Sequence, residues 1–482
     1  MALDILPDEL LLIIVRFVRP LDIEAFTSTC RRIHTIGEVR LVAHRALKAR
    51  YGSLLIRDRE YMEEGLQTDL TIINHPIRLF SDILDDPWIA DYVNYICFEC
   101  DQRGLYTTDL GEEETAILQT LRHREDVLSM PAFNFLTGDK REEWQEGILY
   151  AQPETLFAAL LPLLSSLTRL RLTGFNYRDD LLSEVYDHAR NTSIAVLPQL
   201  NTVEAYQEHR QQGFMGQTLT LFSQFPSVKK LVGNCIVVDE NEFPSSAYSY
   251  ASAVEVIALT DSGFHTKSDL SRVLQSTMTL KEFRYSSGHR MNPVLIIDCR
   301  EIVQLLREHV AETLEVLSLT ATNDVSARSI GSLRKFKRLR ELEIDFKMLI
   351  MSYDDDEDTD VEDTEDTGET ALESGFYEAS SEDGVDRIPR AVDILPTSIE
   401  RIVLRLQEHE EDVPAFLDDL TTEEGPTLPN LKKFVYHGRT LDDDVRAIIR
   451  NAGIAVGRRQ GYQFKAHHDR FWDDDPGLPR DE

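Results

Sequence analysis

One short pattern of apolar positions, apolar-x-x-apolar-x-apolar, recurs along most of the chain. Six consecutive copies begin at residues 200, 228, 254, 280, 314 and 339, so that they lie 28, 26, 26, 34 and 25 residues apart. Alternating apolar positions are typical of a strand with one buried face. The pattern predicts one strand per copy, and the copies begin at Val93, Leu167, Leu200, Val228, Val254, Leu280, Leu314, Leu339, Ile399 and Leu431.

Helix-forming stretches separate several of these strands. Residues 269–278, 302–312 and 443–452 carry apolar residues at helical spacing, and Gly453 follows the last of them where a terminal glycine is common. A strand and a helix repeated at this period resemble the leucine-rich repeats, whose units have about 20–29 residues. The resemblance implies an α/β solenoid, in which parallel strands line one face of a horseshoe and helices line the other.

Two long gaps interrupt the repeat. Residues 353–386 hold 16 Asp and Glu and no Lys or Arg, a composition that predicts an acidic, disordered insertion. The gap between the copies at Val93 and Leu167 is open to two interpretations. It contains either one unrecognised repeat or a helical elaboration, with helices at residues 115–130 and 141–149.

The N-terminal residues show helical spacing instead. A first helix, which Pro20 ends, carries an apolar stripe at Leu10, Ile13, Ile14, Phe17 and Val18. A second helix is predicted to begin after Asp22 and to carry Arg31 and Arg32 near its C-terminal end, where cations are stabilised. A hairpin of this size rarely folds alone, so we expect it to need a partner surface.

This region resembles the F-box motif in four blocks that match in order, residues 6–10, 13–14, 17–23 and 29–34. In that family the module binds a Skp-family adaptor of a cullin-RING ubiquitin ligase through apolar contacts. The sequence departs from many family members at Ile33, where they have Trp. The resemblance implies eight adaptor-binding residues: Leu6, Pro7, Leu10, Ile14, Val18, Pro20, Ile23 and Cys30.

An F-box followed by divergent repeats is similar to the fungal-like F-box/leucine-rich-repeat proteins, and it predicts four parts of the chain. Residues 1–58 would form the helical F-box module with a following helix, and residues 59–88 a connecting segment. The divergent repeat horseshoe would occupy residues 89–465, including the insertion at 353–386. Residues 466–482 would form a polar tail.

Charge and composition narrow the class of partner. The chain has 51 Lys and Arg against 85 Asp and Glu, a net charge of −34. Nucleic acid and anionic membranes are therefore disfavoured partners, because binding phosphates requires surplus cations. Five cysteines are too few for a secreted disulfide scaffold, and we expect neither a signal peptide nor a membrane-spanning segment, because the apolar runs are short and interrupted. We expect an intracellular protein, cytoplasmic or nuclear.

No motif in the sequence predicts catalysis. The chain lacks an HExxH, P-loop or GxSxG motif, and the pair Cys97 and Cys100 has no second pair to complete a structural zinc site. We therefore expect no catalytic residue, metal ion or cofactor. Side chains predicted to point outward from the strands are candidates for binding a protein substrate: Arg169, Arg171, Tyr206, Arg284, Glu341, Glu343, Arg401 and Arg405.

These features predict the substrate receptor of an SCF-type ubiquitin ligase. The F-box would bind the Skp-family adaptor, and the repeats would bind a protein substrate. An alternative from another class is a scaffold that binds the adaptor without ligase output.

Overall fold

The computed structural model describes residues 5–57, 70–99, 110–124, 127, 133–134, 136–173, 181–182, 184–187, 196–206, 216–238, 252–264, 266–287, 298–321, 329–350, 388–406, 410–422, 425–437 and 443–458. The chain divides into two compact units. The first comprises Met1–Ile330 and Lys335–Leu339, and the second comprises Gly331–Arg334 and Arg340–Glu482. The predicted insertion at 353–386, Cys100 and the predicted tail at 466–482 lie outside the described residues.

The N-terminal module of the first unit consists of α1 (Asp8–Phe17), η2 (Pro20–Asp22), α2 (Ile23–Ser28) and α3 (Arg31–Tyr51). The prediction of a single second helix is wrong, because the helix is interrupted at Cys30. Cys30 has an extended backbone, and its Sγ accepts a hydrogen bond from the backbone N–H of Ile33. Arg31 and Arg32 therefore begin α3 instead of ending α2.

A close approach of α2 and α3 holds this module together. Gly37 is buried on α3, and a Cβ added there would lie 2.8 Å from Cγ2 of Thr27 on α2. Leu11 and Val15 of α1 are fully buried in the same interior. Glycine at position 37 thus permits a crossing that a larger side chain would force apart.

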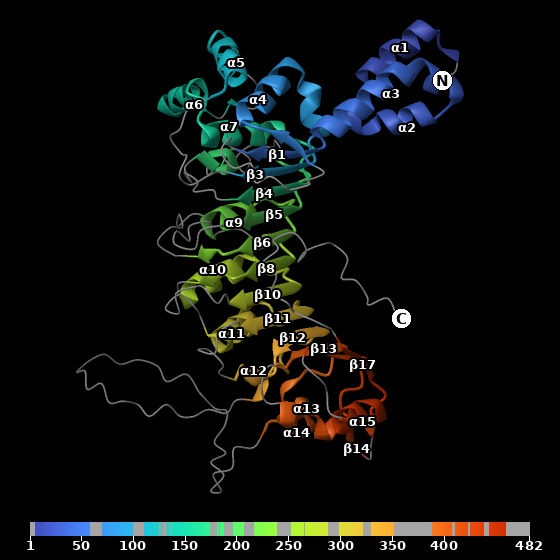
Figure 1. Ribbon diagram of the computed structural model, residues 1–482, viewed down its shortest axis with the longest axis vertical. Helices are drawn as coiled ribbons and strands as arrows, with labels where there is room; N and C mark the ends of the chain where they lie inside the picture. Colours follow the sequence, from blue (N-terminus) through green and yellow to red (C-terminus); the bar gives the residue numbers. More distant parts are fainter. Residues whose placement is uncertain are drawn as a thin grey trace, which may run out of the picture. The chain divides into compact units, whose positions relative to one another are not determined.

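Nine described strands form an open, parallel sheet in the first unit (Figure 1). Each strand pairs with its neighbours in parallel, as in Arg171 of β4 opposite both Cys97 of β3 and Glu204 of β5. From one side to the other the order is β2 (Thr71–Ile73), β1 (Ser53–Arg57), β3 (Tyr95–Glu99), β4 (Arg169–Thr173), β5 (Thr202–Tyr206), β6 (Lys230–Asn234), β8 (Val256–Thr260), β10 (Glu282–Ser287) and β11 (Val316–Ala321).

The repeating apolar positions form the core of this sheet. Leu170 and Leu172 of β4 and Phe283 of β10 are fully buried. Where β6 has Gly233 in place of a third apolar residue, an added Cβ would lie 2.7 Å from Cδ2 of Leu259 and 3.2 Å from Cδ1 of Leu219. Neighbouring leucines therefore already fill the space that a side chain at position 233 would occupy.

Helices cover one side of this sheet, and Figure 1 shows α9, α10 and α11 stacked beside the strands from β5 to β11. Each strand–helix unit buries an apolar helix face, such as Ile302, Val303 and Leu306 of α11. Among the described residues, the first-unit helices outside the N-terminal module include α4 (Pro76–Asp85), η3 (Pro87–Tyr92), α5 (Glu112–Arg122), α6 (Asp139–Leu149), α7 (Pro153–Leu160), η6 (Leu161–Leu163), α9 (Gly216–Ser223), α10 (Lys267–Ser276) and α11 (Cys299–His309). A short parallel pair joins β7 (Val237–Val238) to β9 (Gly263–Phe264).

The gap between the copies at Val93 and Leu167 is a helical elaboration. Its described residues contain α5, α6, α7 and η6, and β3 pairs directly with β4. Of the two interpretations left open by the sequence, the additional repeat is excluded for the residues that the structure describes. The first of the two predicted helices is shorter than expected, since α5 ends at Arg122.

The second unit repeats the same architecture around β12 (Glu341–Asp345), β13 (Arg401–Arg405), β16 (Lys433–His437) and β17 (Ala455–Arg458), which are paired in parallel in that order. β12 and β13 are neighbours although residues 353–386 lie between them in the sequence. The other elements formed by described residues of this unit are α12 (Lys347–Ile350), α13 (Ala391–Ile394), η11 (Glu410–Asp412), α14 (Val413–Leu417), η12 (Asp418–Leu420), the antiparallel pair β14 (Thr421–Thr422) and β15 (Gly425–Pro426), and α15 (Asp443–Asn451).

All ten predicted strands are present, but the sheets extend further than expected. β1 and β2 precede residue 89, where the repeats were expected to begin, and β2 and α4 lie in the predicted connecting segment 59–88. β17 follows the last predicted strand. Leu54, Leu55 and Ile56 of β1 are all buried, so this strand has no alternating pattern by which it could be recognised.

Candidate protein-binding surfaces

The first candidate surface is an apolar face on α1. Leu10 is 46% exposed, Ile13 48% and Phe17 76%, and the preceding Ile5 and following Leu21 are also exposed. Leu11 and Val15 of the same helix are buried in the module. Helix α1 thus has two apolar sides, of which one packs on the module and the other faces solvent. Contiguous exposed apolar surface is typical of a site that binds another protein.

The structure places the eight predicted adaptor residues differently. Pro7 and Leu10 are exposed, and Leu6, Ile14, Val18 and Cys30 are partly exposed. Pro20 and Ile23 are buried within the module, so they support its fold and do not lie on its surface. The sequence-based set missed Ile13 and Phe17 as members of this surface, although both had been assigned to the apolar stripe of the first helix.

Arg32 of α3 fixes the start of α1. Its Nη2 donates a hydrogen bond of 2.7 Å to the carbonyl oxygen of Leu6, and its Nε donates one of 2.9 Å to Oδ1 of Asp8. The carboxylate of Asp8 also lies in the first turn of α1, where negative charge is favourable. Arg32 therefore positions the segment that leads into the apolar face.

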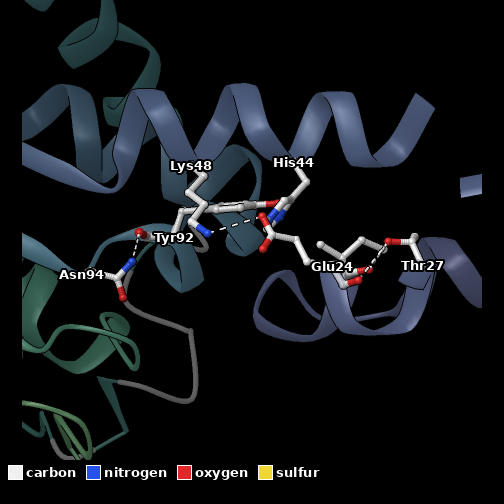
Figure 2. Close-up of polar contacts among 7 residues, drawn as sticks. Glu24, Thr27, His44, Lys48, Tyr92 and Asn94 are labelled. Atoms are coloured by element: carbon white, nitrogen blue, oxygen red, sulfur yellow. Dashed lines mark hydrogen bonds and ion pairs between the residues drawn. The ribbon is translucent and has the colours of Figure 1, made fainter. Parts of the chain in front are cut away.

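A buried histidine joins the N-terminal module to the start of the repeats (Figure 2). His44 of α3 lies with its Nδ1 3.1 Å from the hydroxyl of Tyr92 in η3 and its Nε2 3.3 Å from Oε1 of Glu24 in α2. Lys48 also contacts Oε1 of Glu24, at 3.4 Å. Burial lowers the pKa of His44 below its ordinary value of 6.5, and the contact with Glu24 only partly opposes this effect.

We expect this junction to weaken in mild acid. Because the pKa of His44 is lower in the folded protein than in the unfolded chain, the unfolded chain binds more protons below about pH 6.5, and the free energy of unfolding falls as the pH falls through this range. Urea unfolding between about pH 8 and about pH 5 should show this loss.

His44→Gln is the matched control for this pH dependence. Glutamine cannot be protonated in this range, so the variant should lose part of the pH dependence of the free energy of unfolding. The ion pair between Glu24 and Lys48 should persist to more acidic pH, because Lys48 lowers the pKa of Glu24. Identical pH profiles for the wild type and His44→Gln would contradict the assignment.

The second candidate surface lies on β3, β4 and β5. Glu204 of β5 accepts a hydrogen bond of 2.7 Å from Nε of Arg169, and its other carboxylate oxygen lies 3.7 Å from Nε of Arg171. Each arginine also stacks on a tyrosine. The guanidinium of Arg171 lies 4.0 Å from the ring centroid of Tyr206, and that of Arg169 lies 5.2 Å from the ring centroid of Tyr95.

Ion pairs also join the other predicted substrate residues. In the second unit, Arg401 of β13 contacts the carboxylate of Glu341 on β12 at 2.7 Å. Arg405 contacts Glu343 at the same distance. In the first unit, Arg284 pairs with Glu282 on its own strand, β10. Each predicted arginine therefore has a carboxylate partner within its own unit.

A model of the leucine-rich repeat domain matches residues 72–388, which is more than half of the 482-residue chain. This chain belongs to the leucine-rich repeat family. The match begins after the N-terminal helices, so the F-box resemblance stays a prediction. No curated protein matches the sequence.

Two solved structures are similar to this leucine-rich repeat protein. The leucine-rich repeat-containing protein LegL7 from Legionella pneumophila is 12% identical, and the match covers 79% of this chain and 95% of that chain with a TM-score of 0.34. In the yeast complex of Rad7 and Elc1, the matched chain is 12% identical, and the match covers 93% of this chain and 92% of that chain with a TM-score of 0.29. At these values neither similarity bears on function.

The repeat strands are less exposed than the sequence suggested. Tyr206 and Glu343 were expected to point outward into solvent, yet both are buried, as is Glu204. Neighbouring parallel strands lie only about 4.8 Å apart, so long arginine side chains from adjacent strands cover the residues between them. The candidate surface therefore consists mainly of arginine side chains, with acidic and aromatic groups beneath them.

Three further observations concern the thiol of Cys97, metal binding and membrane spans in the part of the chain that the structure describes. Cys97 is a buried free thiol whose pKa is raised to about 12 by burial, which disfavours the reactive thiolate. No group of His, Cys, Asp or Glu among the described residues could hold a metal ion. None of the described helices is both long and apolar enough to cross a bilayer.

Proposed function

We propose that this leucine-rich repeat protein is the substrate receptor of an SCF-type cullin-RING ubiquitin ligase. The observation that carries the proposal is the exposed apolar face of α1, on which Leu10, Ile13 and Phe17 meet solvent in a module whose sequence resembles the F-box. In this proposal the face is buried by a Skp-family adaptor. Burying such side chains would contribute about 1.5–3 kcal/mol each when complete.

The repeats would supply the second binding surface. Leucine-rich repeats bind proteins across extended strand faces, and the arginine side chains on β4 are of a type that is common at the centre of protein interfaces. The contact of His44 with Tyr92 would help hold the adaptor-binding helices to the start of the repeats.

The proposed mechanism is proximity. A receptor that holds its substrate beside the ligase raises the effective concentration of substrate lysines at the ubiquitin-charged carrier. The chain would contribute binding surfaces, while other subunits would catalyse ubiquitin transfer. Such a role requires an intracellular location and protein partners.

Co-expression of the full chain with a Skp-family adaptor tests the proposal. We expect the two proteins to co-purify in equal amounts, and a folded chain that does not bind the adaptor would overturn the ligase assignment. In cells, a variant that loses adaptor binding should stabilise the substrate. Adaptor binding without any stabilised protein would instead support the alternative of a non-ligase scaffold.

A further inference from the structure

The arginine–tyrosine cluster of β3, β4 and β5 contains more positive than negative charge. We define this cluster as Tyr95, Arg169, Arg171, Glu204 and Tyr206. Glu204 is its single carboxylate, while both arginines are cationic at any physiological pH. The cluster thus carries a net charge of about +1 in a chain whose net charge is −34.

Glu204 neutralises mainly one of the two arginines. Nη2 of Arg169 lies 2.6 Å from Oε1 of Glu204, a close, charge-assisted contact. Nε of Arg171 lies 3.7 Å from Oε2, which is too long for a hydrogen bond, and this buried oxygen accepts none from the described residues. Arg171 therefore retains guanidinium donors that Glu204 does not use.

Arg171 is nevertheless largely removed from water. Its side chain is only 20% exposed, and its guanidinium lies against the Tyr206 ring. Among the described residues, Glu204 is the one carboxylate within ion-pair distance of Arg171. A cation that has lost most of its water and is only partly paired favours an additional anionic partner. Arg169, whose side chain is 40% exposed, leaves the cluster open to such a partner.

We propose that this cluster binds a carboxylate side chain from an acidic segment of a partner protein. A single carboxylate would bring the net charge of the cluster from about +1 to zero, and the planar guanidinium of Arg171 matches it in two parallel hydrogen bonds. A phosphate carries about −1.5 to −2 charges and would leave excess negative charge beside the buried Glu204. The cluster therefore suits aspartate or glutamate better than a phosphorylated residue.

This inference gives a chemical class to the substrate surface of the proposed receptor and rests on that function for its biological role. Its test measures peptide binding alone. Co-purification with the adaptor is measured on the same preparations. A failure of the proposed function would appear there, whereas a failure of this inference would appear in the peptide measurement.

Fluorescence anisotropy on the full chain tests the inference. The probe is a short, labelled glycine–serine peptide with two glutamates, compared with peptides that have glutamine, lysine or phosphoserine at the same positions. We expect the glutamate peptide to bind more tightly than the other three. Arg171→Gln should weaken its binding about tenfold or more, because a charge-assisted hydrogen-bond pair is lost.

Lys281→Gln is the matched control. It removes the same charge from the same unit, at an exposed side chain that pairs with Glu255 at 2.6 Å, and it should leave peptide binding unchanged. Arg169→Gln, at the more exposed arginine, replaces Arg171→Gln if the latter does not fold. Equal binding of the glutamate and glutamine peptides, or equal weakening by Lys281→Gln, would overturn the inference. Tighter binding of the phosphoserine peptide would overturn the choice of a carboxylate.

Discussion

Replacing both Leu10 and Ile13 with aspartate is expected to abolish co-purification with a Skp-family adaptor. These side chains are 46% and 48% exposed in the chain alone, so the charges meet water and the fold should change little. In a complex the same charges would be buried in an apolar interface without a partner, which costs several kcal/mol. We therefore expect at least about a hundredfold loss of affinity in a pull-down or by calorimetry.

Ile72→Asp provides the matched control for this variant. Ile72 lies on β2 and is 49% exposed, so the same substitution is made at the same exposure but away from α1. It should leave adaptor binding intact. By contrast, Leu11→Asp places a charge at a fully buried position of α1 and should unfold the module. Adaptor binding that survives in the Leu10→Asp, Ile13→Asp variant would show that this face is not the interface.

Phe157→Ala is expected to cause the largest loss of stability. Phe157 of α7 is fully buried, and its ring centroid lies 4.9 Å from that of Phe98 on β3, beneath the strands that carry the arginine–tyrosine cluster. Truncating such a buried ring removes its apolar contacts and leaves a cavity. The free energy of unfolding should fall by about 3–5 kcal/mol, which urea unfolding followed by circular dichroism would measure.

Tyr150→Ala removes an aromatic ring of similar size from a nearby exposed position. Tyr150 is 56% exposed, so the change should alter the free energy of unfolding by no more than about 0.5 kcal/mol. If Phe157→Ala lowered the free energy of unfolding no more than Tyr150→Ala does, the contact of Phe157 with Phe98 would add little to the stability of this unit.

The strands were predicted most reliably because their signal is local and repeated. Each copy places apolar residues at fixed spacing, as at Leu317 and Leu319 of β11, and both residues are fully buried. β1 and β17 were not predicted from this pattern. β1 is buried on both faces, and β17 is a short strand paired only with β16 among the described residues, so neither carries the full apolar pattern.

The N-terminal helices were recognised, but their boundaries were not. The break between α2 and α3 depends on the extended backbone of Cys30 and on the hydrogen bond that its Sγ accepts. Apolar spacing continues through this point, so periodicity alone predicts one helix. Pro20 and Ile23 match the F-box framework, yet only their packing shows that they lie inside the module.

The spacing of apolar residues was enough to predict the repeat architecture, the positions of ten strands and the apolar stripe on the first helix. Each of these depends on the spacing of residues close together in the chain. The packing of the folded chain was needed to show which apolar residues of α1 remain exposed and which carboxylate each arginine contacts. Arg171 and Glu204 are 33 positions apart in the chain, and only the register of β4 against β5 brings them together. Such contacts depend on how distant segments pack, which residue spacing does not encode.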